Sequence, residues 1–202
     1  MHAAIQLPSV FADGFFHTLP RLRSPRAFFD TIVVSIPRAL TLSMNQLAFL
    51  GLTALAATLA PGSIAAFMFA YNLYGVPLAI VGASYSVAAF PTLSAALARG
   101  QRDVFLDHIA TAARYVAFWS LPATGLVIVL RAYMVRVILG SGAFDWTDTR
   151  LTAAALGLLS VSLFAQGLAL LLVRGYYAAG RTFVPFAVST VTAAATIGLG
   201  AL

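Results

Sequence analysis

Long runs of apolar residues, separated by short polar breaks, make up most of this 202-residue chain. Each run is near or above the roughly 20 residues that an α-helix needs to cross a bilayer. None alternates apolar and polar positions as a lipid-facing barrel strand does. The pattern therefore predicts an all-α fold, a polytopic membrane helix bundle of about five transmembrane helices, over residues 28–59, 63–97, 111–139, 151–179 and 183–202.

The breaks between the runs carry residues that end or start helices. Pro61 and Gly62 lie in the first break, and Gly140 opens the third. Asp148 or Thr147 is expected to cap the helix that follows, since a short polar side chain can accept from the free amides of the first turn. Because all the breaks are short, successive helices should alternate in direction.

The composition supports a membrane location. Hydrophobic residues make up 61% of the chain and charged residues only 9%, whereas soluble domains carry roughly 25% charged residues. The 12 basic residues are all arginine, and apolar stretches interrupt them, so no continuous basic face exists to bind nucleic acid. The chain has no cysteine, which excludes disulfides and thiolate metal sites.

The arginines also predict an orientation. If the region before residue 28 is cytoplasmic, alternation places eight arginines on the cytoplasmic side and three on the other, with Arg38 inside a span. This agrees with the positive-inside rule. The cytoplasmic set is Arg21, Arg23, Arg26, Arg99, Arg102, Arg114, Arg174 and Arg181, and the opposite set is Arg131, Arg136 and Arg150.

A polar stripe runs along the first predicted span. Its members recur every three or four residues, with Gln46 beside them: Thr31, Ser35, Arg38, Thr41 and Asn45. Arg38 either faces a water-filled cavity and binds an anionic substrate, or extends to the interface or pairs with Asp30. Asn45 and Gln46 could be ligands or could hydrogen-bond between helices.

Small residues share one face of the second span: Asn72, Gly75, Ala79, Ala83 and Ser86. Such a stripe allows close helix packing, and it could also leave room for a large substrate. Pro77 is expected to kink this helix, and in transporters such breaks often line the transport path. Pro37 and Pro122 are placed to kink the first and third spans.

No enzymatic constellation is visible. The three histidines are isolated in expected loops, no phosphate-binding glycine loop is present, and every Asp lies at or outside the end of a predicted span. We therefore expect no catalytic residue, no metal site and no cofactor.

Short strings along most of the chain resemble the MurJ (MviN) type of lipid II flippase, within the multidrug/oligosaccharidyl-lipid/polysaccharide exporter superfamily. Their order and spacing match those of the family's sixth to eleventh helices. The strings occupy residues 5–8, 36–46, 61–65, 69–78, 89–94, 140–144, 148–149 and 176–182, with Pro185.

The resemblance implies that the chain is the middle of a larger exporter fold. Residues 1–27 would be the end of a preceding helix and a cytoplasmic loop, and residues 28–202 part of the C-terminal lobe. The implied function is to flip lipid II, the lipid-linked peptidoglycan precursor, across the bacterial inner membrane by alternating access. The implied partners are lipid II, membrane lipids and the missing N-terminal half of the same protein, with no nucleic acid.

The chain departs from the family at Asn72, which aligns with a functionally important arginine. Asn lacks the charge that makes arginine a good diphosphate ligand. Arg38 stands where better-known members have a small residue, so we hypothesise that it restores the lost charge. The expected substrate-binding residues are Arg38, Thr41, Asn45, Gln46 and Asn72. Related exporters of O-antigen type, drug/cation antiporters and a non-transporting membrane scaffold are the alternatives.

Overall fold

The computed structural model describes residues 25–140 and 144–200. The chain divides into two units, Met1–Ile36 and Pro37–Leu202. Of the first unit, residues 25–36 are described, and they form the opening turns of helix α2 (Pro25–Ala57). The expected end of a preceding helix and most of the expected loop over residues 1–27 lie outside the described residues.

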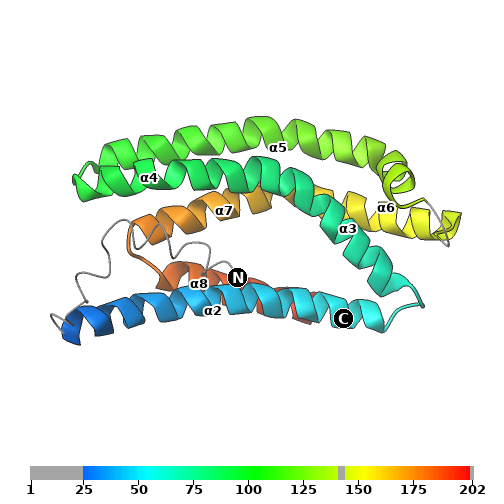
Figure 1. Cartoon of the computed structure of the whole chain (residues 1–202), viewed down its shortest axis with the longest axis horizontal. Coiled ribbons are helices and arrows are strands. Elements are labelled where there is room, and N and C mark those ends of the chain that lie inside the picture. The colour runs from blue at the N-terminus through cyan, green and yellow to red at the C-terminus, as the bar shows by residue number, and fades with distance from the viewer. Residues whose placement is uncertain (1–24, 141–143, 201–202) are drawn as a thin grey trace, which may run out of the picture. The chain divides into compact units, whose positions relative to one another are not determined.

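Every regular element in the described residues is a helix, which confirms the all-α prediction (Figure 1). The second span is a composite of α3, a short π-helical stretch η2, and α4. The fourth span is also composite, made of α6 and α7. After α2, the elements are α3 (Ser63–Leu78), η2 (Ala79–Ala83), α4 (Ser84–Ala98), α5 (Arg102–Leu139), α6 (Trp146–Val161), α7 (Leu163–Ala178) and α8 (Phe183–Gly200).

Four helices are long and apolar enough to cross a membrane, and the bent pair α6 and α7 makes a fifth candidate span. Large apolar side chains lie exposed on their surfaces, including Val129, Val137 and Leu158, which are 75%, 84% and 78% exposed. Such surfaces are unfavourable in water and suit a lipid environment. The fold is therefore that of a multi-pass helical membrane protein.

The third helix begins earlier than its apolar run. It starts at Arg102, nine residues before the expected position 111, and so includes Asp103, Asp107 and His108. Hydropathy marks only the part of a helix that matches the bilayer core, whereas backbone hydrogen bonding continues through the polar interface. His108 therefore lies on a helix and not in a loop.

Helix α6 is capped by a residue other than those expected. The N-cap is Asp145, whose Oδ1 accepts from the Asp148 amide at 2.8 Å, while Asp148 Oδ2 accepts from the Asp145 amide at 3.1 Å. This reciprocal pair is a capping box that satisfies two free amides. The prediction of Asp148 or Thr147 as N-cap was wrong, although Asp148 takes part in the cap.

Both composite spans break in their middle. In the second span, η2 begins two residues after Pro77, in agreement with the expected break at this proline, and the π turn shifts the helix register. In the fourth span, α6 and α7 meet at Ser162 at an angle of 48°. Figure 1 shows α3 turning away from the direction of α4 at the break in the second span.

The two broken spans pack against each other. A Cβ placed on Gly82 of η2 would lie 2.9 Å from the Cα of Gly167 in α7, so the two backbones touch at this crossing. A second contact joins α3 to the break between α6 and α7, where Tyr74 Oη and Ser162 Oγ lie 3.3 Å apart. The main buried cluster joins α3, α5, α6 and α7 and comprises Ala70, Tyr74, Val127, Val135, Ala153, Leu156 and Leu163.

Candidate functional site

The polar stripe of α2 has two different environments. Arg38 and Asn45 are seven residues apart, which places them on one face of the helix, and both are exposed. Thr41, between them, is only 2% exposed, and its Oγ1 donates to the Pro37 carbonyl at 2.8 Å. The face available to a ligand therefore contains Arg38 and Asn45, while the Thr41 hydroxyl is bonded within its own helix.

Arg38 contacts the end of a different helix. Its guanidinium carbon lies 5.2 Å from the centre of the Tyr177 ring, near the C-terminus of α7. This cation–π geometry is worth about 0.5–1 kcal/mol at an exposed site. It orients the guanidinium without neutralising its charge, so Arg38 remains able to bind an anion. The side chain of Asp30, the alternative partner, lies outside the described side chains.

Asn72 does not lie beside Arg38. Helices α2 and α3 meet where the rings of Phe49 and Tyr71 approach to 4.8 Å between centroids. Phe49 is eleven residues after Arg38, which is about 16 Å along a helix. Asn72 follows Tyr71 directly, so it lies nearer the level of Asn45 than that of Arg38. A charge on Arg38 thus acts at a different depth from the position that Asn72 occupies.

The amide side chains of α2 and α3 form no hydrogen bonds within the described part of the chain. Asn45, Gln46 and Asn72 are all exposed, and among the described residues none has a side-chain hydrogen-bond partner. Interhelical hydrogen bonds within this part of the chain therefore do not account for them. They remain available to groups outside it.

The small-residue stripe of the second span is only partly a packing face. Asn72 and Ala79 are exposed, and a Cβ on Gly75 would meet no atom within 4 Å. Ser86 is buried, but the tight contact with α7 is made by Gly82, which the stripe does not include. The register shift at η2 explains this, because a stripe drawn at 3.6 residues per turn loses its face across a π turn.

The chemistry of the site is that of binding. It offers one cation, three free amides and an open backbone at Gly75, and no described His, Cys, Asp or Glu cluster could hold a metal ion. Sequence reasoning missed Tyr177. A tyrosine pair at the end of a span is a recognisable interfacial signal, but nothing local connects it with Arg38.

The exposed apolar helices and the two broken spans define a multi-pass helical membrane protein. The family model described as lipid II flippase MurJ matches residues 1–202. The chain therefore belongs to the MurJ lipid II flippase family, as the resemblance in the sequence predicted.

Individual relatives agree with this assignment. A probable lipid II flippase MurJ of Rhizobium tropici is 28% identical over 171 residues, which are 85% of this chain and 32% of that protein. The corresponding protein of Treponema pallidum is 27% identical over 206 residues, or 99% of this chain and 39% of its own length. That of Thermotoga maritima is 28% identical over 174 residues, covering 86% and 34%. The chain thus spans about a third of the length of these relatives. No solved structure matches it significantly.

Proposed function

We propose that this chain forms the middle of a lipid II flippase, including most of its C-terminal lobe. The whole protein would move the lipid-linked peptidoglycan precursor across the bacterial inner membrane by alternating access. The observation that carries the proposal is the family match over the entire chain. Transport, not a chemical reaction, is the activity proposed.

The substrate-binding roles follow from the chemistry of the exposed groups. Arg38 would bind the diphosphate of the substrate, since a guanidinium matches phosphate oxygens in geometry and charge. Asn45, Gln46 and Asn72 would hydrogen-bond its sugar or peptide groups, and Thr41 would hold the α2 backbone beside Arg38. In this proposal, Arg38 compensates for the uncharged Asn72 by supplying a cavity charge at a different depth.

The Tyr177 ring gives this proposal a specific test. In a bacterium depleted of its own flippase, the full-length protein should support growth, and Arg38→Ala should abolish or strongly slow it. Tyr177→Phe keeps the ring and should behave as wild type, whereas Tyr177→Leu removes the surface on which the guanidinium lies and should weaken growth.

Two results distinguish a failure of the proposed Arg38 role from a failure of the flippase assignment. Unchanged growth with Arg38→Ala would reject the role of Arg38 while leaving the flippase assignment intact. Failure of the wild-type protein to support growth, at normal expression and membrane insertion, would reject the assignment itself and favour another exporter or a scaffold.

A further inference from the structure

A cavity of about 720 Å³ lies between the first turns of α5 and the last turns of α7. This volume is in the range typical of small-molecule sites. Its walls are largely apolar, and no residue of the polar stripe on α2 lines it. The apolar lining includes Leu97, Phe105, Leu106, Ile109, Leu172 and Ala178.

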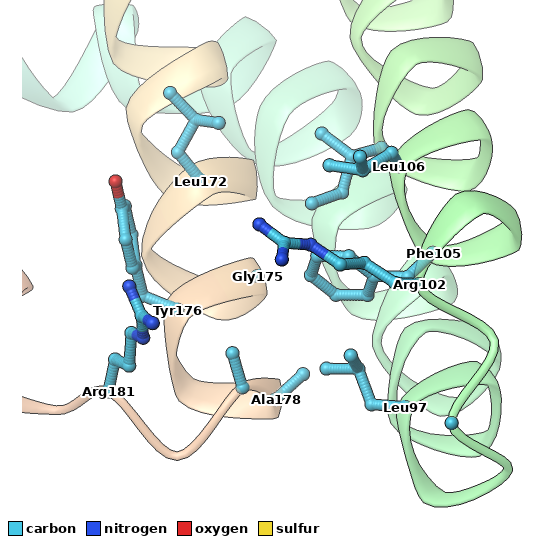
Figure 2. A pocket seen from close by; sticks show the side chains of 12 residues that line it. Leu97, Arg102, Phe105, Leu106, Leu172, Gly175, Tyr176, Ala178 and Arg181 are labelled. Atoms are coloured by element: carbon cyan, nitrogen blue, oxygen red, sulfur yellow. The ribbon is translucent and has the colours of Figure 1, made fainter.

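Two arginines stand at the mouth of this cavity. Figure 2 shows Arg102 extending from α5 toward Gly175 of α7, and Arg181 rising beside the ring of Tyr176. Both arginines are exposed, and among the side chains that the structure describes neither forms an ion pair. Two cations that no described acidic side chain neutralises thus line one cavity, Arg102 from the first turn of α5 and Arg181 from the connection between α7 and α8.

The backbone before each of these arginines has a defined helix-ending geometry. Gly180 has φ +69°, and its amide donates to the Tyr177 carbonyl at 3.1 Å, while the Arg181 amide donates to the Tyr176 carbonyl at 2.9 Å. This is a Schellman motif, which ends α7 and sets the direction of the next residue. The same pair of bonds closes α4 at Gly100, with φ +70°. Each arginine therefore follows a helix end of defined backbone geometry, Arg102 two residues after Gly100 and Arg181 directly after Gly180.

Polarity changes with depth along the cavity. Leu106 and Ile109 follow Arg102 by one and two turns of α5, which is about 6 and 10 Å along the helix. Leu172 of α7 also lines the cavity, and Ile109 packs against Gly175 of α7, since a Cβ on Gly175 would lie 3.0 Å from Cδ1 of Ile109. The charged end lies where α4, α5, α7 and α8 begin or end, at the level expected for the membrane surface. A phospholipid has the same order of groups, with a phosphate above and methylenes below.

We propose that this cavity binds an anionic phospholipid of the leaflet on that side, which the arginine distribution predicts to be cytoplasmic. The phosphate would lie between Arg102 and Arg181, and an acyl chain would lie against Leu106 and Leu172. Guanidinium groups bind phosphate oxygens in pairs, and basic pockets between spanning helices are suited to anionic headgroups. The bound lipid links the start of α5 to the end of α7.

Native mass spectrometry of the full chain in detergent tests this directly. Phosphatidylglycerol should bind at lower concentration than phosphatidylcholine with identical acyl chains. The double variant Arg102→Gln with Arg181→Gln should weaken phosphatidylglycerol binding about 25-fold, since each arginine near an anionic surface contributes about fivefold. Ala178→Trp keeps both arginines but fills the cavity, and it should weaken binding as well.

A matched control distinguishes a built site from general positive charge. Arg99 and Arg114 are exposed and do not line the cavity. Changing both to Gln removes the same net charge and should leave phosphatidylglycerol binding within twofold of wild type. An equal loss in this control would overturn the proposal, as would equal binding of the two lipids or full binding by Ala178→Trp.

Soluble competitors test whether the two arginines bind a soluble phosphate compound and not a lipid headgroup. Inorganic phosphate or ATP at millimolar concentration should not displace phosphatidylglycerol, because neither can use the apolar wall. Displacement by either would overturn the lipid assignment in favour of a soluble phosphate ligand. Thermal melts that match wild type show that the variants remain folded.

Discussion

The backbone contact between Gly82 and Gly167 predicts that a single methyl group at Gly82 destabilises the packing of η2 against α7. A Cβ on Gly82 would lie 2.9 Å from the Gly167 Cα and 3.1 Å from Cδ1 of Leu78. Because carbon atoms pack best at about 3.5–4.0 Å, η2 and α7 would have to separate by about 0.6 Å. Helix α7 cannot simply retreat, since a Cβ on Gly167 would itself lie 3.0 Å from Cγ1 of Val116 on α5.

The expected effect of Gly82→Ala is therefore that of overpacking, which costs about 1–3 kcal/mol. Gly75→Ala is the matched control in the same span, because its added Cβ meets nothing within 4 Å. Both substitutions gain about 0.5–1 kcal/mol of helix preference, so the difference between them isolates the packing term. For a protein of this size, that difference corresponds to about 2–12 °C in melting temperature.

Fluorescence of Trp119 and Trp146 during heating of the purified protein in detergent measures this difference. Gly82→Ala should melt clearly below Gly75→Ala, and Gly75→Ala should melt at or slightly above wild type. Equal midpoints for the two variants would refute the close crossing of η2 and α7.

Two further substitutions test the ends of helices. Asp145→Ala removes the capping box of α6 and should destabilise this helix by about 1 kcal/mol. Hydrogen exchange should then be faster at the first amides of α6. Unaltered exchange would contradict the cap. Gly180→Ala places a side chain at φ +69° and should lower the stability by about 1 kcal/mol. Gly198→Ala is the control, because its added Cβ meets no atom within 4 Å and should not lower the stability. Equal melting temperatures for these two variants would contradict the left-handed turn at Gly180.

The helices themselves were predictable because bilayer thickness sets a length that apolar runs must meet. Pro77 also indicated the break in the second span. The break at Ser162 was not predictable, since serine is common in membrane helices and no proline lies near it. The capping residue of α6 was misplaced by two or three positions because Asp145, Thr147 and Asp148 are all good caps, and only the folded backbone shows which one precedes the first turn.

The sequence predicted only those features of the candidate site that lie within a single helix. Periodicity placed Arg38 and Asn45 on a common face, and both are exposed. It could not show that Thr41 is buried, that the Tyr177 ring lies against Arg38, or that Arg102 and Arg181 line one cavity. Each of these depends on contacts between segments far apart in the sequence, and the π turn at η2 additionally shifts any pattern drawn across it.

Transport of lipid II by the full-length protein is the most direct test of the proposed function. In proteoliposomes that contain fluorescent lipid II, the protein should make lipid in the inner leaflet accessible to an outside reagent faster than protein-free vesicles do. Lipid II movement no faster than in protein-free vesicles, from a folded and correctly inserted protein, would contradict the flippase assignment.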